Sequence, residues 1–131
     1  MKLYSSDLDR LGMLSSQSFR ATRLVVDTGM HALGWSRQQA IDYMLAHTAE
    51  SAHSVESEID RYIIWPGQAT GYMIGMLEIR GARDEAEKAM GARFDIKAFH
   101  DRVLEDGGVP LTYLRGKIRA WSGATPRPQS R

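Results

Sequence analysis

Three polar residues, Arg23, Asp27 and His31, occupy every fourth position of a mostly apolar stretch. At this spacing the side-chain direction turns by only about 40° per step around an α-helix, so the residues form one polar stripe. Asp27 could accept a hydrogen bond from one ring nitrogen of His31, which would fix the tautomer and leave the other nitrogen for a substrate or water. The same spacing is typical of a helical ion pair followed by a histidine near the helix C-terminus, and spacing alone favours this structural alternative.

A second polar group surrounds the tripeptide Trp65-Pro66-Gly67, which predicts a corner because the residue before a proline avoids the helical conformation. Arg61 and Tyr62 precede the corner, while Gln68 and Tyr72 follow it, one helical turn apart. A tyrosine hydroxyl, an amide and a guanidinium could together hold a carboxylate or stabilise a developing oxyanion. The alternative is a buried corner whose polar groups bond only to one another.

Gly67, Gly71 and Gly75 also recur at every fourth position. A glycine inside a helix costs roughly 1 kcal/mol relative to alanine, so this stripe predicts that a neighbouring helix approaches closely. The other histidines are interpreted as structural, with His47 and His53 at the surface and His100 packed on a helix. The chain has no cysteine and no His-Glu-x-x-His motif, so we expect no metal ligands in it.

The composition is that of one ordinary globular domain with one core. Of the 131 residues, 43% are hydrophobic and 25% charged, and the formal net charge is +1. This balance predicts neither a nucleic acid nor a membrane as a partner, and there is no apolar run long enough to span a bilayer. The sequence begins without the apolar region of a secretory signal, so we expect a cytoplasmic protein.

Apolar residues at helical spacing predict about six helices and no strand. The first is expected over residues 7–33, with Gly12 as a possible interruption and Gly34 at its end. The others are expected from Ser36 to near Thr48, from Ser51 or Ser54 to just before Pro66, from Pro66 to Gly91, from Asp95 to Leu104 and from Pro110 to Trp121. We therefore predict an all-α, orthogonal or irregular bundle over residues 1–122, followed by a disordered tail over 123–131.

Three segments of the chain resemble the C-terminal part of a bacterial family known as domain of unknown function 885. The segments are RATRLVVDTGMHALGWSRQQAIDYM, RYIIWPGQATGYMIG and FDIKAFHDRVLEDGGVPL. The resemblance covers nearly everything up to Trp121. It implies a mostly helical zinc peptidase related to thimet oligopeptidase and the angiotensin-converting enzymes. The His-Glu metal motif and the further glutamate of that family would lie N-terminal to this stretch, so the resemblance implies zinc in the complete domain and no zinc ligand or other cofactor here.

The resemblance also implies roles for the residues around the corner. Tyr62 or Tyr72 would donate a hydrogen bond to the oxyanion, and His31 would be a second catalytic donor oriented by Asp27. Asp27 also joins the substrate-binding residues, which would include Arg61 and Gln68.

The leading hypothesis is therefore a C-terminal fragment of a zinc metallopeptidase that forms the substrate side of the cleft and is inactive alone. Its expected partners are a missing N-terminal metal-binding half, encoded upstream or as a separate chain, or a second copy of itself, with a peptide as substrate of the complete enzyme. The alternative is a self-standing helical module that binds a protein or peptide without catalysis.

Overall fold

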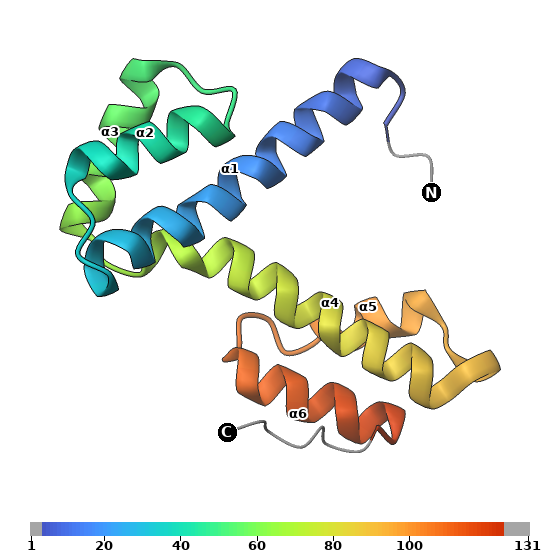
Figure 1. Cartoon of the computed structure of the whole chain (residues 1–131). Coiled ribbons are helices and arrows are strands. Elements are labelled where there is room, and N and C mark those ends of the chain that lie inside the picture. The colour runs from blue at the N-terminus through green and yellow to red at the C-terminus, as the bar shows by residue number, and fades with distance from the viewer. Residues whose placement is uncertain (1–3, 125–131) are drawn as a thin grey trace. The chain divides into compact units, whose positions relative to one another are not determined.

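The computed structural model describes residues 4–124 of the chain (Figure 1). Within these residues the fold is all-α, which confirms the predicted class, and no strand is present. The elements in chain order are α1 (Asp7–Ala32), α2 (Arg37–His47), α3 (Ala52–Ile64), the short 3₁₀ helix η1 (Gln68–Thr70), α4 (Gly71–Met90), the 3₁₀ helix η2 (Gly91–Arg93), α5 (Ile96–Leu104) and α6 (Leu111–Ser122).

Local sequence signals explain where most helices begin and end. The Ser6 side chain accepts a hydrogen bond from the backbone N–H of Asp9 and caps α1, which continues without interruption through Gly12. The predicted capping box of Ser36 begins α2, and Ser51 caps α3. Gly34 follows α1 with a φ of 72°, in the left-handed region that glycine enters without a steric penalty.

The predicted start of the fourth helix at Pro66 is wrong. Gly67 adopts a φ of 80° and the chain then forms η1, so α4 begins only at Gly71. The glycine stripe does not mark a close approach either, because a Cβ added at Gly67, Gly71 or Gly75 would meet nothing within 4 Å. Gly67 is instead explained by its left-handed backbone, which turns the chain from α3 into η1.

The described residues up to Ile74 and those from Gly75 onward form two compact units, each with its own hydrophobic cluster, where composition suggests a single core. In the first unit, α2 and α3 pack on the C-terminal half of α1 (Figure 1). Its cluster consists of Val26, Ala40, Ile41, Met44, Val55, Ile59, Tyr62 and Ala69. The cluster of the second unit consists of Ala82, Ala86, Phe99, Leu114 and Ile118.

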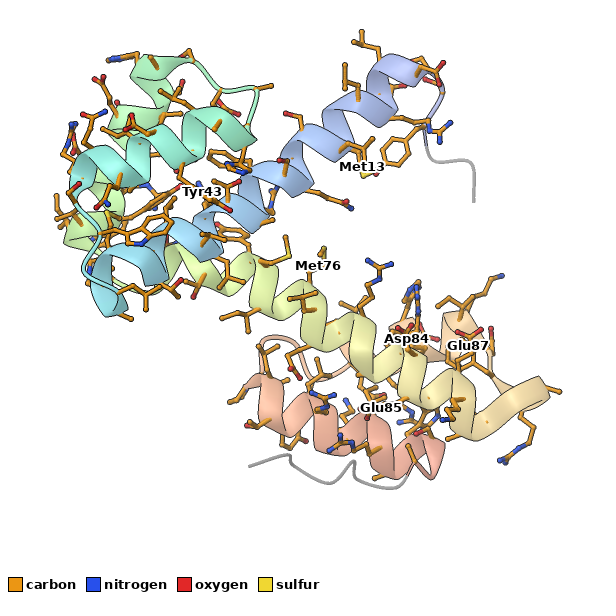
Figure 2. All side chains as sticks on the ribbon, viewed as in Figure 1. Met13, Tyr43, Met76, Asp84, Glu85 and Glu87 are labelled. Atoms are coloured by element: carbon orange, nitrogen blue, oxygen red, sulfur yellow. The ribbon has the colours of Figure 1, made fainter. Side chains whose placement is uncertain are left out.

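An ionic network ties α6 to α4 within the second unit. Glu85 lies on the side of α4 that faces α6, whereas Asp84 and Glu87 do not (Figure 2). The Glu85 carboxylate accepts hydrogen bonds from Arg115 at 2.8 Å and from Arg119 at 2.9 Å. The bonds from Arg119 and Arg115 outweigh desolvation and lower the pKa of Glu85 to about 2.

The N-terminal half of α1 carries three leucines at helical spacing on its surface. Leu8, Leu11 and Leu14 are each more than half exposed. The described residues contain no helix with the length and apolar character required to cross a bilayer. Residues 125–131 of the predicted disordered tail lie outside the described range, so their disorder stays a prediction.

Candidate functional site

The polar stripe of α1 fastens this helix to α3 and to the corner that follows it. Arg23 contacts side chains of α3, Asp27 binds the backbone of the corner, and His31 binds a backbone carbonyl of α3. Each residue thus reaches a partner more than thirty positions away in sequence. The predicted stripe exists, but its partners are on other elements and not within α1.

Arg23 belongs to a partly buried hydrogen-bond network centred on Glu58. Its Nε donates to the hydroxyl of Tyr62 at 2.7 Å, and its Nη2 donates to Oε2 of Glu58 at 2.7 Å. The Tyr62 hydroxyl in turn donates to the same Glu58 oxygen. Arg61 adds a further hydrogen bond to Glu58 at 2.8 Å, so two guanidinium groups and a phenol converge on one carboxylate.

This convergence fixes the protonation states of Glu58 and Tyr62. Desolvation alone would raise the pKa of Glu58, but hydrogen bonds from Arg61, Tyr62 and Arg23 outweigh it and lower the pKa to about 2. Burial, together with the hydrogen bond to Glu58, raises the pKa of Tyr62 above its usual range. Tyr62 therefore remains a neutral phenol whose proton is committed to Glu58.

Asp27 holds the corner in place. The residue is 3% exposed, and both of its carboxylate oxygens lie 3.0 Å from the backbone nitrogen of Gly67. The left-handed conformation of Gly67 leaves its N–H without a helical partner, so the Asp27 carboxylate supplies the acceptor that this N–H lacks. Asp27 is thus a structural acceptor and does not orient the His31 ring as predicted.

His31 is oriented by α3 instead. Its Nε2 lies 3.0 Å from the carbonyl oxygen of Tyr62, and because a carbonyl can only accept, Nε2 carries the proton. The ring is at the surface, and its Nδ1 has no partner among residues 4–124. The predicted arrangement, one nitrogen fixed and the other free, is present with a backbone carbonyl in the role expected of Asp27.

Arg61 and Gln68 bind each other across the corner. Arg61 Nη1 donates to Oε1 of Gln68 at 2.9 Å, and the guanidinium lies 4.9 Å from the centre of the Tyr62 ring. Gln68 is exposed, so this pair lies at the surface beside the network around Glu58.

Tyr72 has the opposite environment to Tyr62. Tyr62 is fully buried, whereas Tyr72 is 51% exposed in the first turn of α4. Two guanidinium groups contact the Tyr72 ring, those of Arg20 at 5.6 Å and Arg23 at 5.5 Å from its centre. Cationic groups therefore position the ring, while its hydroxyl makes no hydrogen bond within the described residues.

Two residues of this site were missed from the sequence, Glu58 and Arg20. Glu58 lies three and four positions before Arg61 and Tyr62, a helical spacing that could have revealed it. Arg20 donates hydrogen bonds to the backbone and hydroxyl of Ser16, but it has no carboxylate partner in the described part of the chain. Only the structure shows that Arg20 contacts Tyr72.

The implied zinc does not fit the residues that the structure describes. Between residues 4 and 124, no three histidine, aspartate or glutamate side chains come close enough together to hold a metal ion. Asp27 is bound to Gly67, and Glu58 is neutralised by two arginines, so neither is a free ligand.

Comparison with known proteins gives the family. The sequence profile of the family described as "Bacterial protein of unknown function (DUF885)" matches residues 1–118. A crystal structure described as "the putative lipoprotein from Colwellia psychrerythraea" is 45% identical, with a TM-score of 0.90. The match covers 93% of this chain and 21% of the relative, so the chain spans about a fifth of the relative's length. A comparison with curated proteins gives no match. The chain belongs to the bacterial family of unknown function DUF885.

Proposed function

We propose that this chain forms the substrate-side wall of the cleft of a zinc peptidase, as the C-terminal part of a larger family domain. The proposal is supported by the resemblance of two short strings, Arg61-Tyr62 and Gly67-Gln68 with Gly71-Tyr72, to strings of the thimet-oligopeptidase type of enzyme. The zinc ligands would lie on another part of that domain, because the described residues offer no suitable group. Alone, this chain would be inactive.

Tyr72 is the residue on which the proposal depends. An oxyanion donor must reach the solvent-exposed substrate with a hydroxyl that is not already bonded. Tyr72 meets both conditions, whereas the Tyr62 hydroxyl is buried and donates to Glu58. We therefore assign the catalytic hydrogen bond to Tyr72 and give Tyr62 the role of positioning Arg23, which contacts the Tyr72 ring.

His31, Arg61 and Gln68 complete the proposed wall. With its proton on Nε2, His31 cannot be the second donor that the resemblance implies, and its free Nδ1 would instead accept a hydrogen bond from a substrate amide. Gln68 would donate its amide hydrogens to a substrate carbonyl. Arg61 holds Gln68 in place. Asp27 contributes indirectly, because its bond to Gly67 fixes the corner from which Gln68 and Tyr72 project.

The experiment is the substitution of the tyrosine equivalent to Tyr72 by phenylalanine in a full-length, zinc-loaded member of the family. We expect kcat for peptide hydrolysis to fall about a hundredfold or more, with little change in KM. The matched control is the same substitution at the tyrosine equivalent to Tyr113, which is exposed on α6. This substitution should leave kcat unchanged. Unchanged kcat in the Tyr72 variant would reject the assignment, and a family member without peptidase activity would reject the proposed function itself.

The second candidate function is a helical protein-binding module without catalysis. One observation favours it, the exposed row formed by Leu8, Leu11 and Leu14 on α1. The two candidates are separated by purifying the protein from its native cells and measuring its zinc content and its mass by sedimentation, since only the peptidase requires bound zinc.

The cytoplasmic location also stays a prediction, which cell fractionation would test. The lipoprotein description applies to the Colwellia protein alone.

A further inference from the structure

The second unit contains a hollow that the proposed peptidase site does not use. It lies between α4 and α5 and has a volume of about 420 Å³, within the usual range of small-molecule pockets. Met76, marked on α4 in Figure 2, lies at one end of the stretch of α4 that contributes to it. The lining residues are Met76, Ile79, Arg80, Arg83, Phe99, His100, Val103 and Leu104.

The lining combines an apolar floor with a basic edge. Five of its residues are apolar, and the other three are Arg80, Arg83 and His100. No acidic side chain lines the hollow. Within residues 4–124, Arg80 makes no ion pair, and Arg83 pairs only with its exposed sequence neighbour Asp84, an interaction worth little at a surface. The hollow therefore lacks negative charge of its own.

His100 was predicted to be a packed helix residue, and this prediction is wrong. The side chain is exposed and stands at the edge of the hollow, beside the buried Phe99 that forms part of its floor. The apolar positions of α5 face α4 and α6, and His100 follows directly after one of them. His100 thus lines the same hollow as the two arginines of α4.

We propose that this hollow binds a small carboxylate with a linear apolar tail, of the medium-chain fatty acid class. The tail would cover the apolar floor, and the carboxylate would accept hydrogen bonds from Arg80 and Arg83. A peptide fits less well, because the lining offers no serine, threonine, asparagine or glutamine side chain to pair with buried amide groups. An alkyl chain needs no such partners. The site is independent of the proposed peptidase function.

The test is a titration of the full chain with decanoate below its micelle concentration, followed by amide NMR. We expect shifts in residues 76–83 and 99–104, and none in the first unit. The Arg80→Gln, Arg83→Gln double variant should bind about tenfold more weakly. Its matched control is Arg102→Gln, because Arg102 is exposed on α5 and paired with Glu105 but does not line the hollow.

Two further ligands and one variant make the result decisive. Decanol has the tail without the charge and should bind about tenfold more weakly than decanoate. Leu104→Glu places a negative charge at the exposed edge and should abolish decanoate binding without disturbing the fold, checked by circular dichroism. Equal affinity for decanol, an equal loss in Arg102→Gln, or no shift at all would overturn the proposal. Tighter binding of an N-acetylated dipeptide of similar size would also overturn it, in favour of a peptide.

Discussion

At the scale of single residues, Tyr62 and Tyr72 have hydroxyl groups in opposite surroundings. The Tyr62 hydroxyl accepts from Arg23 and donates to Glu58 inside the first unit, so it links two charged groups that water reaches poorly. The Tyr72 hydroxyl is at the surface. A phenol that links buried charges contributes to stability, whereas an exposed, unpaired phenol is available for chemistry.

This contrast predicts that Tyr62→Phe is destabilising. The substitution removes two hydrogen bonds to charged groups and leaves Arg23 and Glu58 less completely satisfied, which should lower the free energy of unfolding by about 1–3 kcal/mol. Urea unfolding at neutral pH measures the change. Tyr113→Phe is the control, because its hydrogen bond to Asp106 is exposed and its loss should have an effect below about 0.5 kcal/mol. Equal effects of the two substitutions would contradict the structural role of Tyr62.

Glu58 also predicts a dependence of stability on pH. Its pKa in the folded chain is about 2, below the usual 4.5, so between these values the unfolded chain binds more protons than the folded chain. The stabilisation from Glu58 is therefore complete above about pH 4.5 and is lost as the pH falls towards 2. Glu85 should behave in the same way.

Urea unfolding at a series of pH values between 5 and 2 tests this prediction. Glu58→Gln should reduce the slope of the unfolding free energy against pH in this window, because the titrating group is gone. Glu56→Gln, at an exposed position of the same helix, should leave the slope unchanged. A slope that is the same in both variants would show that the cluster does not hold the Glu58 pKa down.

At the scale of elements, the end of α1 is shaped by one close contact. Trp35 folds back over Gly29, and the backbone N–H of Trp35 donates to the carbonyl of Gly29 at 2.9 Å. A Cβ at position 29 would lie only 2.6 Å from two ring atoms of Trp35. The ring is packed against the hydrophobic cluster of the first unit, so it cannot easily move away.

Gly29→Ala should therefore lower the free energy of unfolding by about 1–3 kcal/mol through overpacking. Gly12→Ala provides a control on the same helix, since a Cβ there would meet nothing within 4 Å. This second substitution should instead stabilise the chain by up to about 1 kcal/mol, because alanine is the better helix former. Thermal unfolding followed by circular dichroism measures both, and a neutral Gly29→Ala would show that Trp35 can move aside.

Helix positions could be predicted from the sequence because they depend on local signals. Ser36, Ser51 and Asp95 cap their helices as their side chains suggest, with partners two or three residues away. The start of α4 could not be predicted in this way. Pro66 is compatible with a helix start, and only the left-handed backbone of Gly67 delays the start of the α-helix. Likewise, the spacing of Leu8, Leu11 and Leu14 shows an apolar side without showing what covers it.

The site was predictable as a set of residues but not as a set of contacts. Asp27, His31, Arg61, Tyr62 and Gln68 meet around the corner, whereas their spacing placed Asp27 and His31 in one group and the corner residues in another. Asp27 and His31 bind backbone groups of Gly67 and Tyr62, and Arg61 binds an acid that was overlooked, Glu58; such long-range pairing depends on how the helices pack. The different roles of Tyr62 and Tyr72 follow from burial, which spacing along one helix does not determine.

At the scale of the whole molecule, the chain combines two internally packed units with apolar side chains that remain at the surface. Each unit has a hydrophobic cluster and an ionic network of its own. Leu8, Leu11 and Leu14 nevertheless project from α1 without a partner in the described residues. A contiguous apolar row of this kind is typical of a surface that contacts another protein.

We expect the purified chain to self-associate through this row. Sedimentation velocity should show an average mass that rises with protein concentration. The triple variant Leu8→Gln, Leu11→Gln, Leu14→Gln should remain a monomer, because glutamine keeps the helix but removes the apolar contact. Leu33→Gln with Ile64→Gln is the matched control, since these side chains are equally exposed but lie outside the row, and it should associate like the original chain. A chain that stays monomeric at every concentration would mean that the leucines need a different partner, whereas association that survives the triple variant would place the contact elsewhere.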